Sequence, residues 1–198
     1  MPLPQLLSPV QSALLPINCY PWGGTYRPAA FARCGLEDGR LRVLLWCEED
    51  ERDRPRYFKR NDPVSQDSCL EFFLNGWPEL TGLYVNFAVN RAGTMLLEVG
   101  VDRWHRRFPQ PGETPGVDFP AARAFEWEKG WGVELDIPEA FLQAICGVHA
   151  PLAPEKLRAN FYKCGAVGDR EHYACWAPVD TPEPDYHQPA FFRPFWRG

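Results

Sequence analysis

The residues of this sequence that could do chemistry are polar side chains that interrupt apolar strand patterns. Side chains alternate between the two faces of a strand, so a sandwich strand should bury one face only. In residues 67–75 this alternation places Glu71 on one face with Cys69 and Phe73. A carboxylate there is costly unless it meets water, a cation or a hydrogen-bonding ligand. We therefore expect Glu71 to line a groove.

Two further segments, residues 84–90 and 157–162, show the same mixed polar and aromatic face. If the three strands pair in one sheet, their donors and acceptors form a patch of the kind that grips vicinal hydroxyls. The patch would comprise Glu71, Asn86, Arg158, Asn160 and Tyr162. The alternative is a structural network in which Arg158 neutralises Glu71 and the amides satisfy backbone edges.

Catalytic and metal-binding motifs are weak in this sequence. Cys164, His172 and Cys175 match no strong zinc signature. Cys164 with His172 is an equally weak match to a catalytic nucleophile and its base. No phosphate-binding glycine loop or nucleophile elbow is present. Carboxylates near residues 48–53 could hold Ca²⁺ but show no ordered ligand pattern. We expect no catalytic residue and no cofactor, with calcium left open.

Composition argues against several classes of partner. The net charge of -5, from 26 acidic and 21 basic residues, gives no electrostatic reason to expect nucleic acid or an anionic membrane. No apolar run approaches the ~20 residues that cross a bilayer. The N-terminal stretch lacks the basic and continuous apolar regions of a secretory signal. The seven cysteines, an odd number, favour free thiols, and we expect a cytoplasmic protein.

Prolines and glycines, 21 and 16 of them, divide the chain into segments too short for most helices. Residues 31–36 and 41–48 flank Asp38-Gly39 and predict a hairpin, because Asp-Gly favours tight turns. Further strands are expected at 68–75, 83–90, 94–99, 124–128, 131–137, 157–163, 173–176 and 190–195, with a short helix at 138–145 and loop over most of 101–123. The sequence predicts an all-β protein, a jelly-roll or immunoglobulin-like β-sandwich with one short helix. We expect residues 1–198 to form a single domain.

Several blocks of the chain together resemble the family 9 carbohydrate-binding modules. They are Trp22…Pro28, Asp67-Ser68-Cys69-Leu70-Glu71-Phe72-Phe73, Tyr84-Val85-Asn86-Phe87…Asn90…Gly93, Arg158-Ala159-Asn160-Phe161-Tyr162 and Trp176-Ala177-Pro178…His187-Gln188-Pro189…Phe192. Their order and approximate spacing hold over most of the chain. The resemblance implies a β-sandwich, often calcium-stabilised, that binds sugars without cleaving them.

The resemblance also implies a sugar clamped between two tryptophans, and here the sequence departs from the family. Residues 62–66 contain no aromatic side chain, and the second position is occupied by Tyr186-His187. An aromatic ring matters because it buries the apolar C–H face of a pyranose. Trp176, Tyr186 or His187 could supply the ring contact, and Trp22 and Tyr57 are other candidate platforms.

Three functions remain open from the sequence. The first is a non-catalytic protein that binds a saccharide on a concave sheet face, through Glu71, Asn86, Arg158, Asn160 and Tyr162 with Trp176, Tyr186 or His187. The alternative is a cytoplasmic sandwich that has lost sugar binding and binds another small ligand or a protein partner. The third is a glycan-cleaving enzyme, which needs two carboxylates roughly 5 to 10 Å apart.

Overall fold

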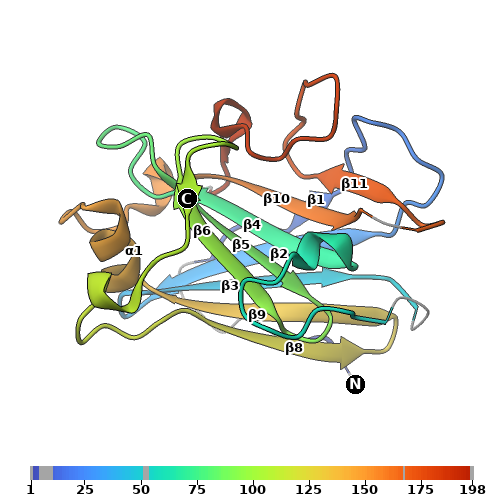
Figure 1. Ribbon diagram of the computed structural model, residues 1–198, viewed down its shortest axis with the longest axis horizontal. Coiled ribbons are helices and arrows are strands. Elements are labelled where there is room, and N and C mark those ends of the chain that lie inside the picture. The colour runs from blue at the N-terminus through green and yellow to red at the C-terminus, as the bar shows by residue number, and fades with distance from the viewer. Residues whose placement is uncertain (1, 5–10, 51–53, 167, 197–198) are drawn as a thin grey trace.

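The computed structural model describes residues 2–4, 11–50, 54–166 and 168–196, and in it two antiparallel sheets pack face to face (Figure 1). The first sheet has the order β1 (Leu15–Ile17), β2 (Ala30–Glu37), β3 (Arg40–Cys47), β9 (Gly130–Pro138), β8 (Ala121–Trp127). The second has the order β11 (His172–Cys175), β10 (Arg158–Gly165), β4 (Cys69–Asn75), β5 (Tyr84–Asn90), β6 (Met95–Gly100), β7 (Arg106–Arg107), and β12 (Arg193–Pro194) also pairs with β10. The predicted β-sandwich is confirmed.

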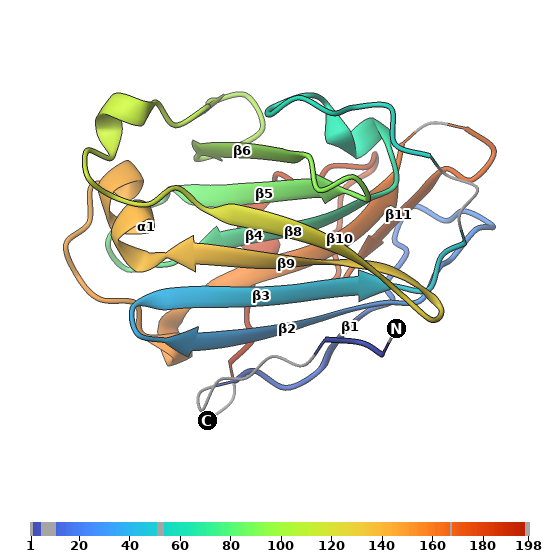
Figure 2. The same cartoon turned by 90° about the horizontal axis from the view of Figure 1, so that it is seen from below.

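Local sequence signals account for the main turns and for the helix. The hairpin between β2 and β3 turns at Asp38 and Gly39, whose φ angles of 50° and 67° are those that Asp-Gly supplies in tight turns. The helix α1 (Glu139–Cys146) ends at Gly147, which adopts the left-handed conformation common after helices. Figure 2 shows α1 beside the end of β9.

The predicted strand at 190–195 is wrong in most of its length. Only Arg193–Pro194 pairs with β10, and Pro189–Phe191 form a 3₁₀ turn. Proline has no amide hydrogen for a strand ladder, so Pro189 and Pro194 confine the pairing to a short edge. The short strands β1 and β7 were not expected, and the predicted loop at 101–123 contains β7 and the start of β8.

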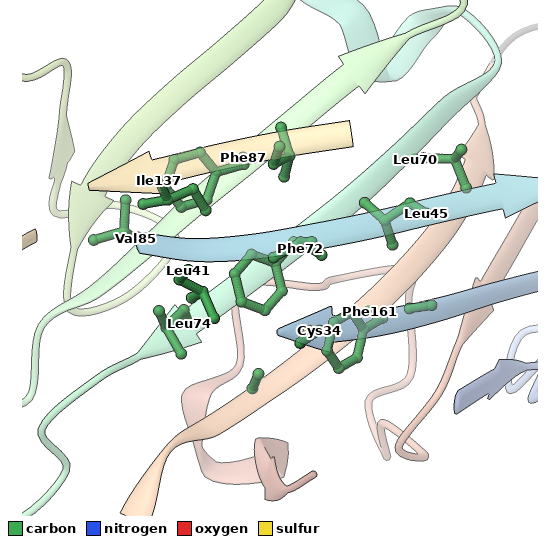
Figure 3. Packing of buried hydrophobic residues seen from close by; sticks show 14 of the residues in the cluster. Cys34, Leu41, Leu45, Leu70, Phe72, Leu74, Val85, Phe87, Ile137 and Phe161 are labelled. Carbon is green, nitrogen blue, oxygen red and sulfur yellow. The ribbon is translucent and has the colours of Figure 1, made fainter. Parts of the chain in front are cut away.

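The main core lies between the two sheets. Figure 3 shows aromatic and aliphatic side chains of both layers meeting there, among them Phe72, Phe87 and Phe161 of the second sheet. The ring centroids of Phe72 and Phe161 are 5.1 Å apart, and those of Phe72 and Phe87 are 6.0 Å apart. These stacked rings belong to the side chains of β4, β5 and β10 that point toward the first sheet.

The outer face of the second sheet is also covered, so every residue of β4 and β5 is buried. A second apolar cluster on this face contains Phe73, Tyr84, Tyr162 and, from the C-terminal segment, Tyr186 and Phe192. Tyr186 stacks on Tyr162 with ring centroids 3.9 Å apart. In Figure 1 the red C-terminal segment passes over this side of the sheet.

A buried lysine joins the two sheets at one end of the sandwich. Lys163 Nζ donates to Ser68 Oγ at 2.8 Å and to His172 Nε2 at 2.7 Å, and lies 3.4 Å from Glu49 Oε1. Both charged side chains are 0 % exposed. Glu49 follows β3 of the first sheet, and Trp131 Nε1 of β9 donates to its other oxygen at 2.9 Å.

The charges of this cluster compensate each other. Burial alone would raise the pKa of Glu49, but Lys163 and the hydrogen bonds from Ser68 and Trp131 lower that pKa to about 2. Burial and the neighbouring Lys163 lower the pKa of His172 to about 4, and its Nδ1 lies 2.6 Å from the Arg170 carbonyl. The imidazole is therefore neutral and accepts from Lys163 through Nε2.

Replacing Lys163 by Met should lower the free energy of unfolding by about 3 to 5 kcal/mol, because it leaves the Glu49 carboxylate buried without a cation. Arg123→Gln is the control, because the exposed Arg123–Glu134 pair should contribute less than about 1 kcal/mol. Urea unfolding at neutral pH measures both. A Lys163→Met variant as stable as the control would contradict the role assigned to this pair.

Candidate functional site

A cavity of about 350 Å³ opens on the outer face of the second sheet. Its floor comes from the outward side chains of β4, β5, β6 and β10, and its walls come from the segments around residues 63–65, 103–106 and 184–187. Its polar lining comprises Ser65, Glu71, Asn86, Glu98, Arg103, Arg106, Cys164, Tyr173, Tyr186 and His187. The volume is within the range of small-molecule sites.

Glu71 is the central carboxyl of the floor and is 4 % exposed. The register sets it opposite Tyr162 on β10 and Ala88 on β5, so its own strand and both neighbours remove it from water. Cys164 Sγ donates to Glu71 Oε1 at 3.1 Å. Burial raises the pKa of Glu71 to about 7. This carboxyl is therefore largely protonated in mildly acidic solution.

Asn86 is an unsatisfied acceptor on the same floor. It is 1 % exposed, and its Oδ1 has no hydrogen-bond partner among the residues that the structure describes. Its cross-strand neighbours are Phe73 on β4 and Glu98 on β6. Buried polar atoms are nearly always hydrogen-bonded, so Asn86 Oδ1 is suited to receive a donor from a molecule in the cavity.

The arginines of the walls are each paired with a nearby carboxylate. Arg106 binds Glu98, and Arg103 Nη1 lies 2.9 Å from Asp185 Oδ1. Burial, with a smaller contribution from Arg106, lowers the pKa of His187 to about 3, so this ring is neutral near pH 7. Its Nδ1 lies 2.9 Å from Tyr84 Oη. The cavity thus offers polar groups of both kinds with little net charge.

The structure brings some of the predicted site residues together in this cavity and places others elsewhere. Glu71, Asn86, Tyr186 and His187 all line it. Arg158, Asn160, Tyr162 and Trp176 do not. The three strands pair in one sheet, in the order β10, β4, β5, as the predicted patch requires.

Arg158 lies at the far end of β10, opposite Asn75, and its side chain is exposed. It lines a different surface depression with Glu79 and Glu155. The interpretation that Arg158 neutralises Glu71 is therefore wrong, because Tyr162 occupies the position opposite Glu71.

The other residues outside the cavity have structural contacts. Asn160 exchanges two hydrogen bonds of 2.9 Å with the backbone of Ala177 and so fixes the chain after β11. Tyr162 lies beneath Tyr186 and donates to its carbonyl at 3.1 Å. Trp176 packs against Phe161 on the core side of the sheet.

The predicted ligand-binding patch did not include Glu98, Arg103, Arg106 or Cys164, which all line the cavity. Glu98 alternates with Leu97 and Val99 in β6, a pattern like the one that identified Glu71. The two arginines lie in a segment predicted as loop, where no periodic pattern indicates which way a side chain points. Next to Arg103, Trp104 is 82 % exposed, and the Arg103 guanidinium lies 5.9 Å from its ring centroid.

The geometry does not support a metal site of Cys164, His172 and Cys175, or Cys164 with His172 as nucleophile and base. Cys164 and His172 point to opposite faces of the sheet, because the residue paired with Cys164 is Tyr173. Near residues 48–53, Glu48 lies 3.6 Å from Lys129 and Asp50 lies 2.9 Å from Arg170. Residues 51–53 fall outside the described residues. The Glu48 and Asp50 carboxylates are thus already engaged by basic side chains.

Stability should fall as pH rises from about 4.5 to about 7, in part because folding favours the protonated form of Glu71. A folded pKa of about 7 against an ordinary 4.5 corresponds to about 3 kcal/mol that is present at pH 4 and lost above pH 7. Glu71→Gln lacks this contribution, and all other titrations are shared. Urea unfolding of both proteins at pH 5 and pH 8 measures the difference, and identical pH dependence in both would contradict the buried protonated carboxyl.

Comparison with known proteins assigns a family. The model of carbohydrate-binding family 9 matches residues 2–195. Among solved structures, a proposed carbohydrate-binding protein from Bacteroides uniformis ATCC 8492 is 25% identical, with a TM-score of 0.73 over 91% of this chain and 84% of that one. No protein among the curated sequences matches this chain.

A family 9 carbohydrate-binding module from Caldicellulosiruptor kristjanssonii is similar in fold, at 13% identity. Its complex with glucose gives a TM-score of 0.58 over 92% of this chain and 82% of the module. Its complex with cellotriose gives 0.55 over 94% and 80%. None of the described helices is long and apolar enough to span a membrane. On the family match over nearly its whole length, this chain belongs to carbohydrate-binding family 9.

Proposed function

We propose that the cavity over β4, β5 and β6 binds one neutral sugar unit of a saccharide and does not cleave it. The observation that carries this proposal is Asn86 Oδ1, a buried acceptor without a partner among the described residues, in a cavity whose two arginines are already ion-paired. An anionic sugar would have to compete with Glu98 and Asp185 for the guanidinium groups of Arg106 and Arg103. A polyhydroxylated neutral ligand needs no counter-charge.

The lining offers a donor or acceptor to each side of a hydroxyl group. Asn86 Oδ1 would accept a hydroxyl proton, and the guanidinium groups of Arg103 and Arg106 have donors left beyond their ion pairs. Glu71, when protonated, both donates and accepts. Hydroxyls are donors and acceptors at once, so a sugar can satisfy these groups together without adding charge.

Aromatic rings near the cavity could hold the apolar face of the sugar. Tyr173, Tyr186 and His187 line the walls. Trp104 is the most exposed large ring and adjoins Arg103 at the rim. Burying its free face against sugar C–H groups would recover hydrophobic energy that the hydroxyls cannot supply. We propose Trp104 as the main stacking platform.

The environments of the two carboxyl groups in the cavity, Glu71 and Glu98, favour binding without cleavage. Glycoside hydrolysis needs one carboxylate free to act as nucleophile or base. Glu98 is tied to Arg106, and Glu71 is buried and hydrogen-bonded to Cys164. The glucose and cellotriose complexes of the Caldicellulosiruptor kristjanssonii module support glucose units as the first ligands to test.

Asn86→Ala should weaken glucose or cellotriose binding at least tenfold, because a sugar hydroxyl loses its buried acceptor. Titration calorimetry on the full chain measures the affinity. Arg158→Gln is the matched control, since this polar residue of β10 lies outside the cavity, and it should bind as the unchanged protein does. Failure of the unchanged protein to bind any saccharide would reject the proposal and favour another small ligand or a protein partner.

Trp104→Ala should weaken the same binding about tenfold with no loss of folding stability, because an exposed ring packs little in the free protein. Leu80→Ala is the control, because Leu80 is an apolar side chain that is 64 % exposed and lines a different cavity. This variant should leave the sugar affinity unchanged. Equal affinities for Trp104→Ala and the unchanged protein would exclude Trp104 as the platform while leaving the sugar site intact.

A further inference from the structure

Two thiols and one carboxyl meet at the floor of the cavity. The register of β4 and β10 sets Cys69 directly opposite Cys164, and Glu71 is two residues along β4 on the same face. The ligand atoms of these three side chains all lie within 4.8 Å of one another. This triangle follows from strand geometry, since opposed residues and i, i+2 neighbours on one face are adjacent.

The three groups have few other partners. Cys164 Sγ contacts Glu71 Oε1 at 3.1 Å and the Ser65 carbonyl at 3.8 Å, and Cys69 Sγ contacts the Leu70 carbonyl at 3.8 Å. Glu71 forms no ion pair with any described residue. Two soft donors and a hard donor are thus held together mainly by contacts with one another and with backbone groups.

The site is reachable and has room for a further ligand. Glu71 and Cys164 line the cavity, whereas Cys69 is fully buried and does not line it. An ion held by the three side chains would therefore have one coordination position open to the cavity. Asn86 Oδ1, the acceptor without a partner among the described residues, belongs to a side chain that lines the same cavity.

We propose that Cys69, Glu71 and Cys164 form a binding site for Zn²⁺. Thiolates select soft or borderline metals and disfavour Ca²⁺ and Mg²⁺, which take oxygen ligands. Zn²⁺ accepts mixed sulfur and oxygen sets in tetrahedral geometry, often with three protein ligands and one open position. Around a tetrahedral zinc the ligand atoms are roughly 3.5 Å apart, so small side-chain rotations close the triangle.

The ligand exchange balances without a redox partner. Two S–H bonds break and two Zn–S bonds form, and the thiol protons leave to solvent. A Glu71 proton leaves as well when this carboxyl starts protonated, and one carboxylate oxygen binds the ion. The remaining position is filled by water or by an oxygen of a molecule in the cavity. The site shares Glu71 and the cavity with the proposed saccharide function. It can be titrated without sugar, so the two proposals are tested separately.

Cobalt(II) titration of the reduced, metal-free full chain tests the proposal. Co²⁺ reports tetrahedral thiolate ligation through an intense near-ultraviolet charge-transfer band and strong visible bands. We expect these bands to saturate at one ion per chain, to disappear when Zn²⁺ is added, and to be absent from the Cys69→Ser/Cys164→Ser variant. Glu71→Gln should weaken the binding of the ion at least tenfold.

The matched control is Cys19→Ser/Cys175→Ser, which removes the other pair of thiols that face each other across a β-bridge. This control should keep the bands. Their absence from the reduced unchanged protein, whose folding is not in question, would overturn the proposal. So would bands that persist without Cys69 and Cys164, or that vanish with Cys19 and Cys175. A Cys69–Cys164 disulfide found in place of metal binding would overturn it too.

Discussion

The second sheet has no face that can be left open to water, and this constraint organises the molecule. Its inward side chains, such as Phe72 and Phe161, form the core with the first sheet. Its outward side chains include Phe73, Tyr84 and Tyr162, which are equally apolar. Exposing such a patch would cost roughly 25 cal/mol for each Å² of apolar surface. The chain therefore folds its own C-terminal segment back over the sheet.

The cavity is where that cover is incomplete, and its electrostatics follow from the same burial. Glu71 lies on a sheet face with little water, so its pKa is raised to about 7. The charges that remain at the rim are paired, as Arg106 with Glu98 and Arg103 with Asp185. A partly covered aromatic face thus becomes a polar cavity with little net charge, which is the environment that a neutral polyol requires.

The fold and the floor of the site were largely predictable from the sequence, because both depend on alternation within strands. Glu71 and Asn86 stand out among apolar residues, and the strands that carry them pair as expected. Alternation could not distinguish Arg158 and Asn160 from Glu71 and Asn86. The position of a residue along β10 and the path of the C-terminal segment decide which outward side chains line the cavity. Asn160 is covered because it hydrogen-bonds Ala177.

The walls were beyond prediction for a different physical reason. Arg103, Trp104 and Arg106 come from a connection whose shape depends on tertiary contacts and not on periodicity. The same limit explains the wrong strand at 190–195, where an apolar composition resembled a strand although its prolines restrict pairing. The thiol pair Cys69 and Cys164 required knowledge of register, which a single sequence does not supply.

The most direct measurement is a crystal structure of the full chain grown with glucose. We expect one glucose in the cavity over β5, with a hydroxyl oxygen at hydrogen-bond distance from Asn86 Oδ1 and the Arg106–Glu98 pair unbroken. Glucose bound only outside this cavity, or an occupied cavity in which Asn86 Oδ1 still lacks a partner, would contradict the role of the buried acceptor.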